Sequence, residues 1–311
     1  MRPAERRLSG AAPHGQRDQR STVTTSSVAG GDAAGAYAGL SVVGKRPPLS
    51  AYLTDAWRRR SFGVTLASNK LIASLLPNRL GVLWIVIKPL SLALIYGAIF
   101  HFVIAGPARP ADFVLYVIVG VFVLEFFTNC FGAGAKAITG NSKLVQSIGF
   151  PRILLPFSVV IEQAMRMVPV VVLMVLLLIV FGETPRWSWL LIVPILLVMG
   201  IFNFGVALVV ARLSVHARDV QQVIPIITRV LFYVSGIFFD VDGALRDFPT
   251  LLTIAHLIPT YDFISLSRAV LLDSYTAPTL AVVAAPVWAV VALVFGVVFF
   301  WRAEARYGLS D

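Results

Sequence analysis

Six long apolar stretches constrain this chain more than any other feature of its sequence. A helix rises 1.5 Å per residue, so about 20 apolar residues cross the roughly 30 Å of hydrocarbon in a bilayer. Hydrophobic residues make up 58% of the 311 residues and charged residues only 14%, which excludes an ordinary soluble globule. We therefore predict an all-α polytopic membrane protein with six transmembrane helices. The predicted spans are residues 82–104, 113–131, 155–181, 189–211, 221–239 and 280–301.

The charge distribution predicts how these spans are oriented. The net charge is +10, and nearly all of it lies within residues 1–88. With a cytosolic N-terminus, the inner loops and tail also carry more Lys and Arg than the outer loops, which favours an N-in, C-in topology. A basic arm next to a membrane domain points to anionic headgroups, so we expect no nucleic-acid partner.

The basic front end divides into two parts. Residues 1–48 are rich in Ala, Gly, Ser and Arg without apolar periodicity, so we predict a disordered cytosolic tail. The tail lacks the apolar core of a secretory signal but partly matches an organelle transit peptide. Residues 50–78 are predicted to form an amphipathic interfacial helix, ahead of a transmembrane domain over residues 80–311. Its apolar face would consist of Leu53, Trp57, Val64, Ala67, Leu71 and Leu75.

Between the fifth and sixth spans lie two apolar pieces that are too short to cross a membrane. They are Phe248–Ile258 and Phe263–Leu272, and Pro259 separates them. Because a proline interrupts a helix, we predict two re-entrant or interfacial helices here.

Ionisable residues within apolar spans are expensive and are functional candidates. These intramembrane charges are Glu125, Glu162, Arg166 and Arg229. Glu162 and Arg166 have the i,i+4 spacing of a helical ion pair. The charges could hold helices together, or Glu125 or Glu162 could serve a proton-driven carrier.

The sequence offers no convincing catalytic, metal or cofactor site. Gly39–Arg46 resembles part of a phosphate-binding loop, but Arg46 replaces the Ser or Thr that would hold magnesium. Asp240 and Asp242 could bind a metal, as in a membrane glycosyltransferase, or could lie in a solvated loop. Cys130 is the one cysteine, which excludes an internal disulfide. We expect a protein that is not itself an enzyme.

The loop between the second and third spans carries apolar residues among polar ones. Leu144 and Ile148 are spaced i,i+4, so a short helix here could insert into a groove on a partner. The same pattern would suit a loop that lies against the membrane.

Several motifs, taken in order, resemble the membrane subunit of type-2 ABC exporters. They are the basic amphipathic helix, Asn78–Trp84 with Pro89–Leu90, Phe150–Arg152 with Leu155–Pro156, and Arg218–Asp219. The most similar branch exports polysaccharides such as O-antigen, teichoic acid and mycobacterial-type galactan. Two features depart from the family pattern: the long tail, and Ser235–Phe238 where many relatives have a Ser/Thr-Pro step.

The resemblance implies a homodimer in the cytoplasmic membrane of a bacterium, working with two copies of a cytosolic ATPase. ATP and magnesium would bind to that partner, and the cargo would be a polyprenyl-pyrophosphate-linked polysaccharide. The segment that docks on the ATPase would contain Asn141, Leu144, Ile148, Phe150, Pro151 and Arg152. The interfacial helix and the chain after it would form a gate with Trp57, Arg58, Arg59, Arg60, Leu71, Arg79, Gly81 and Trp84.

A channel for long glycans needs aromatic surfaces, because sugar faces stack on rings. The first and fifth spans would supply Tyr96, Phe100, Phe232, Tyr233, Phe238 and Phe239. Each ring could equally face lipid or the core. Alternative functions are drug or small-lipid efflux by a related type-2 permease and, less consistent with the sequence, a membrane glycosyltransferase.

Overall fold

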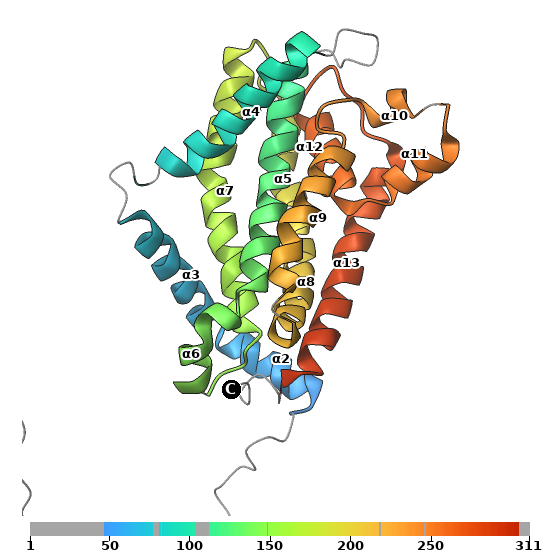
Figure 1. Cartoon of the computed structure of the whole chain (residues 1–311). Helices are drawn as coiled ribbons and strands as arrows, with labels where there is room; N and C mark the ends of the chain where they lie inside the picture. The colour runs from blue at the N-terminus through green and yellow to red at the C-terminus, as the bar shows by residue number, and fades with distance from the viewer. Residues whose placement is uncertain are drawn as a thin grey trace, which may run out of the picture. The chain divides into compact units, whose positions relative to one another are not determined.

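The computed structural model describes residues 47–76, 81, 83–103, 112–147, 149–217, 219–245 and 247–304 (Figure 1). Within these ranges every regular element is a helix and there is no strand, which confirms the predicted all-α class. Residues 1–46, which include most of the predicted tail and the phosphate-loop-like segment, lie outside the described residues, as do Arg79, Ile148 and Arg218.

Four helices in the described part of the chain are long and apolar enough to cross a membrane. They are α5 (Phe113–Ala135), α7 (Leu154–Val180), α8 (Ile192–His216) and α13 (Thr279–Trp301). They coincide with the predicted second, third, fourth and sixth spans. The predicted first span coincides with α4 (Leu83–Val103), a helix of 21 residues.

The predicted fifth span is shorter than expected. Helix α9 (Val220–Val234) has 15 residues, a length of about 22 Å. The chain turns at Gly236, whose φ of 65° lies in the left-handed region, and a side chain there would meet Val241 at 2.6 Å. The helix therefore ends five residues before the predicted boundary, and the count of six spans and their orientation stay predictions.

Helix α5 forms the centre of the bundle. Helices α4, α7, α8, α9 and α12 (Pro259–Leu271) pack against it. Nearly all of its side chains from Phe113 to Phe127 are buried, as expected for a helix that is apolar on every side. Its polar residues lie toward the other end, where α5 is only partly covered.

Helices α8 and α13 cross at two glycines. A Cβ atom on Gly205 would lie less than 3.0 Å from the backbone of Ala292, and one on Gly296 would lie as close to the backbone of Gly205. Small residues allow such backbone contact between membrane helices. This crossing makes α8 and α13 a closely joined pair.

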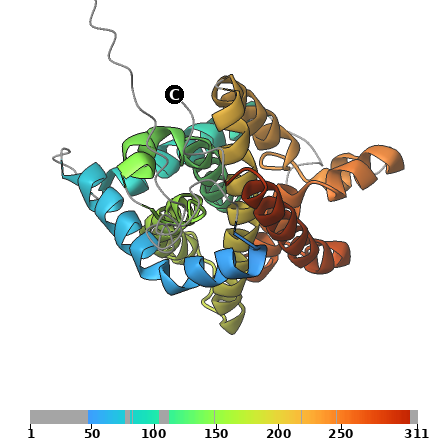
Figure 2. The same cartoon turned by 90° about the horizontal axis from the view of Figure 1, so that it is seen from below.

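The predicted amphipathic helix is two helices, α2 (Leu49–Arg58) and α3 (Arg60–Leu75), with a break at Arg59. Seen from below, they run along one side of the bundle (Figure 2). Of the predicted apolar face only Ala67 is buried against protein, whereas Trp57 is 69% exposed. An interfacial helix turns its apolar face toward lipid, so the interfacial role of these residues stays a prediction.

Small residues explain which side of α2 and α3 is buried. The buried residues of α2 and α3 are Tyr52, Ala56, Gly63 and Ala67. A Cβ atom on Gly63 would meet the Phe157 ring at 2.7 Å, so α3 approaches α7 more closely than large side chains would permit. The large apolar side chains are left on the outside.

Short helices lie at the two ends of the bundle (Figure 1). The lower end holds α6 (Ser142–Ser147), and the upper end holds α10 (Val241–Ala244) and α11 (Pro249–His256). Pro259 begins α12, so the proline separates two helices as predicted. Whether these helices re-enter a membrane stays a prediction.

Candidate functional site

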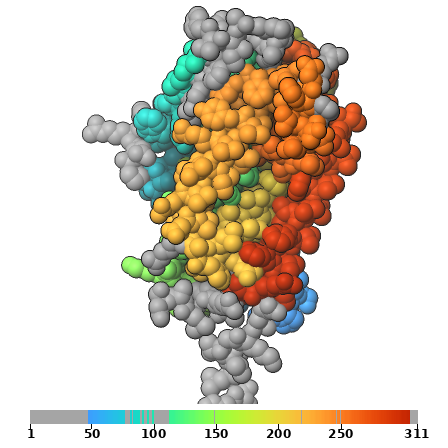
Figure 3. Space-filling view, turned by 45° about the vertical axis from the view of Figure 1, so that its right-hand side comes forward, coloured from blue at the N-terminus to red at the C-terminus, as the bar shows by residue number. Residues whose placement is uncertain are grey.

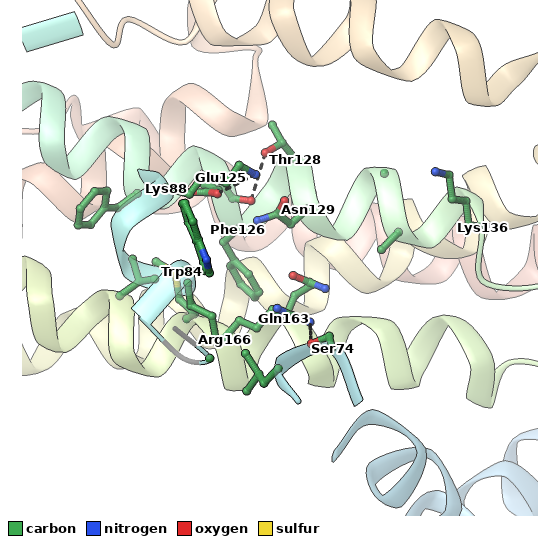
Figure 4. Close-up of a pocket in the computed structure, with 18 residues that line it drawn as sticks. Ser74, Trp84, Lys88, Glu125, Phe126, Thr128, Asn129, Lys136, Gln163 and Arg166 are labelled. Atoms are coloured by element: carbon green, nitrogen blue, oxygen red, sulfur yellow. Dashed lines mark hydrogen bonds and ion pairs between the residues drawn. The ribbon is translucent and has the colours of Figure 1, made fainter. Parts of the chain in front are cut away.

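A polar cavity of about 530 Å³ opens between the end of α3, the start of α4, and helices α5 and α7. Figure 4 shows the polar and aromatic side chains that line it. Its lining includes Ser74, Gly81, Trp84, Lys88, Glu125, Phe126, Thr128, Asn129, Lys136, Gln163 and Arg166. A polar hollow within such an apolar bundle is a candidate site for a ligand.

Among the charged groups of the polar cavity, Lys88, Glu125 and Arg166 have ion-pair partners. Lys88 Nζ lies 3.5 Å from Glu125 Oε1. Arg166 Nη2 donates to Glu162 Oε1 at 2.8 Å, which confirms the predicted i,i+4 pair. The same Nη2 donates to Ser74 Oγ at 2.6 Å, so Arg166 also joins α7 to the end of α3.

The uncharged groups of the cavity suit a ligand with hydroxyl groups. The amides of Asn129 and Gln163 contain donors and acceptors, and the Thr128 hydroxyl, which donates to the Glu125 carbonyl at 3.1 Å, can still accept a hydrogen bond. Trp84, half exposed, offers an aromatic surface for stacking. Sequence reasoning placed Trp84 in the gate but missed the amides, which could have been found as polar residues in otherwise apolar spans.

The fourth predicted intramembrane charge lies elsewhere. Arg229 is exposed on α9 and is not among the residues that line the polar cavity. The structure therefore brings Glu125 and Arg166 to one site, with Glu162 paired to Arg166, and leaves Arg229 on a different face.

The predicted docking segment, residues 141–152, is called the α6 loop below. Asn141 Nδ2 donates to the carbonyl of Ala137 at 2.6 Å. Leu144 is half-buried and packs against the core with Val145, so it does not project freely. The side chains that are exposed belong to Ser142, Lys143, Gln146 and Ser147.

The end of the α6 loop contacts the two interfacial helices. The Phe150 ring lies 5.1 Å from the Phe62 ring. Arg59 Nη1 donates to the carbonyl of Gly149 at 3.1 Å, and Arg59 Nε donates to Asp55. Pro151 is buried. The structure thus brings the predicted docking segment and part of the predicted gate together.

Other predicted gate residues lie on the outside of α2 and α3. Arg58 is exposed, and Arg60 lies 4.8 Å above the Trp57 ring. Leu71 is half-buried. Gly81 and Trp84 instead line the polar cavity.

Four of the predicted channel rings gather near the end of α9. Phe232 lies 5.7 Å from Tyr233 and 5.2 Å from Phe238. Tyr233 is 48% exposed, whereas Phe238 is 2% exposed and belongs to the core. Phe239 is half-buried. Tyr96 and Phe100 lie on α4, and their side chains are outside the described residues.

The two aspartates that could have formed a metal site make hydrogen bonds within the protein instead. Asp240 Oδ2 accepts from the N–H of Gly243 at 3.1 Å and caps α10. Asp242 accepts from the Tyr261 hydroxyl and contacts His256 Nε2, both at 2.8 Å. Among the described residues no group of three or more His, Cys, Asp or Glu side chains is placed to hold a metal.

Comparison with known proteins gives consistent matches. The model of the family described as "ABC-2 type transporter" matches residues 64–272. An O-antigen export system permease protein RfbA of Klebsiella pneumoniae is 27% identical over 177 residues, which cover 57% of this chain and 68% of that protein. The protein of the same name from Myxococcus xanthus is 25% identical over 185 residues, covering 60% of this chain and 70% of the relative.

Proposed function

This chain belongs to the ABC-2 type transporter family, and from that premise we propose that it exports a polyprenyl-pyrophosphate-linked polysaccharide. The chain is a multi-pass protein of the inner membrane, and ABC-2 type permeases are not themselves enzymes. The proposed cargo is a glycan of the galactan, O-antigen or teichoic acid type.

The observation that carries this proposal is the polar cavity with Trp84 at its edge. Hydroxyl groups of a sugar lose water when they enter an apolar bundle, so each needs a new hydrogen-bond partner. Asn129, Gln163 and Thr128 offer such partners. The cavity also has apolar lining residues, such as Phe122 and Met167, so its polar groups, which a drug or a small lipid needs less, are what favour a glycan. The names of the relatives, which export O-antigen, support the same class of cargo.

We assign ATP hydrolysis to a separate cytosolic ATPase, present in two copies, that holds the nucleotide and magnesium. The exposed side of the α6 loop, with Lys143 and Gln146, is the proposed contact. Replacing both with Glu should release the ATPase from the purified complex. The control is Ser188→Ala at the opposite end of the bundle, and unchanged co-purification of the double variant would refute this contact.

We further propose that the permease is a homodimer. Helix α9 lies on the surface of the molecule (Figure 3), and Val223, Ile226 and Val230 are exposed along it. A second copy of this chain would cover these side chains, so Ile226→Cys should give a disulfide-linked dimer in native membranes. A Val283→Cys variant on the exposed side of α13 is the control.

The decisive experiment is transport by the permease–ATPase complex in proteoliposomes loaded with a lipid-linked polysaccharide. A lost aromatic contact of about 1.4 kcal/mol corresponds to about tenfold, so Trp84→Ala should slow export by that factor. Trp187→Ala is the control, because Trp187 is 87% exposed and lies outside the cavity.

Two results would refute the proposed cargo. One is an unchanged rate of ATP-dependent export in the Trp84→Ala variant. The other is efflux of a small apolar compound without movement of any lipid-linked glycan, which would support the drug or small-lipid permease instead.

A further inference from the structure

One carboxylate just after α13 joins segments that are far apart in sequence. Glu304 follows α13 and is 8% exposed. Its Oε2 accepts a hydrogen bond from the Tyr52 hydroxyl at 2.8 Å, and its Oε1 accepts from the backbone N–H of Arg152 at 3.1 Å. Glu304 thus contacts both α2 and the α6 loop.

The partners of Glu304 are themselves linked. The Tyr52 hydroxyl accepts from the backbone N–H of Ile153 at 3.1 Å, and Tyr52 is 3% exposed. The guanidinium of Arg152 donates to the backbone carbonyl of Glu304. We call Tyr52, Arg152 and Glu304 the Glu304 clamp. Every contact within it joins residues at least 100 positions apart in the chain.

Burial makes the clamp a strong polar connection between α2 and the α6 loop. Hydrogen bonds to an ionised carboxylate are stronger than neutral ones, and water does not compete for buried groups. Burial raises the pKa of the Glu304 carboxyl, and the hydrogen bonds from Arg152 and Tyr52 oppose that rise.

Apolar packing also joins α2–α3 to the α6 loop, through Phe62 and Phe150, whereas the other side-chain hydrogen bond between them is more open to water. The side chain of Arg59, which binds the Gly149 carbonyl, is 50% exposed, and exposed polar contacts contribute little. The Trp301 Nε1–H donates to the Pro47 carbonyl at 3.0 Å, which gives α13 a second connection to the start of α2.

We propose that Glu304 is a positioning residue that makes α2 follow the α6 loop when the ATPase moves that loop. This inference rests on the proposed function, in which the ATPase docks on the α6 loop. With the clamp intact, a displacement of Arg152 carries Glu304 and Tyr52 with it. Without the clamp, the loop would move while α2 stayed in place, and ATP would be hydrolysed without transport.

The test uses the full permease–ATPase complex and two nearly isosteric changes, Glu304→Gln and Tyr52→Phe. Arg302→Gln, at an exposed neighbouring position, is the matched control. We expect the clamp variants to keep native ATPase co-purification and hydrolysis, while polysaccharide moved per ATP falls about tenfold, a coupling loss of about 1.4 kcal/mol. The control should equal the native complex.

A second measurement follows α2 without any cargo. Cys130 is the one cysteine of the chain and is fully buried, so a maleimide reports mainly on a cysteine placed at exposed Ala51. We expect ADP with vanadate to change the labelling rate of Ala51→Cys, and Glu304→Gln to abolish that change.

The outcomes separate the inference from the proposed function. A nucleotide response that survives in Glu304→Gln, or one that is absent from the native complex, would overturn the clamp. Parallel loss of folding, hydrolysis and transport in both variants would show a merely structural role and would also overturn it. A native complex that shows the clamp-dependent response but moves no polysaccharide would refute the proposed cargo and leave the clamp supported.

Discussion

The crossing of α8 and α13 predicts opposite effects for two alanine substitutions in one helix. A Cβ atom on Gly205 would lie 2.5 Å from the backbone nitrogen of Leu293, whereas ordinary contact begins at 3.4 Å. The helices would have to separate by about 1 Å, and such overpacking costs about 1–3 kcal/mol. Backbone atoms cannot rotate away as a side chain can, so we expect an overpacking cost near the upper end of this range, about 3 kcal/mol. Gly205→Ala should therefore destabilise the protein.

Gly200 is the matched control, because it lies in the same helix and its Cβ would be 4.0 Å from Phe126. Replacing glycine by alanine improves helix propensity by about 1 kcal/mol at both positions. The difference in stability between the two variants therefore measures the effect of the helix crossing. We expect the free energy of unfolding of Gly200→Ala to exceed that of Gly205→Ala by about 3 kcal/mol, which corresponds to a difference of about 6 °C or more in Tm. Thermal denaturation of both variants in one detergent measures the gap. Equal Tm values would refute the close approach.

Three further predictions concern individual polar groups. Burial raises the pKa of Asp262 to about 7, so the folded protein binds a proton that the unfolded chain releases above about pH 4, and stability falls as pH rises from 5 to 8. Asp262→Asn should flatten that dependence in Tm measured against pH. Arg268 is fully buried and donates to the carbonyls of Tyr116, Gly236 and Ile237. Arg268→Leu should cost about 3 kcal/mol or more, since each unpaired acceptor costs about 1–3 kcal/mol, and a Tm unchanged from native would contradict this role. Ser74→Ala removes the acceptor that Arg166 uses on α3, so limited proteolysis after Leu75 should become faster, with Ser68→Ala as control.

The sequence could predict the features that depend on local spacing. Long apolar runs predicted the four helices that can cross a membrane, and i,i+4 spacing predicted the Glu162–Arg166 pair. Both follow from helix geometry within one segment, so no knowledge of the tertiary structure was needed.

Features that depend on tertiary contacts were not predictable in this way. The side of α2 and α3 that packs on the bundle was not predicted, because it depends on the close approach to Phe157, where the small residues Gly63 and Ala67 are buried. The clamp joins Tyr52 to Glu304, a pair that no periodicity connects. The polar cavity combines single residues from separate helices, and although Trp84, Glu125 and Arg166 could be identified one by one, nothing in the sequence indicated that they lie together.

The shortness of α9 has a consequence for the membrane around the protein. Its length of about 22 Å is about 8 Å less than the hydrocarbon thickness, whereas α7 with 27 residues exceeds it. Lipid beside α9 would have to thin, at a fraction of a kcal/mol for each ångström of mismatch. A lipid bilayer has a set hydrocarbon thickness, but a neighbouring protein does not. The mismatch penalty therefore disappears where α9 packs against another polypeptide. In the proposed homodimer, hydrophobic mismatch would therefore favour covering this face with a second copy of the chain.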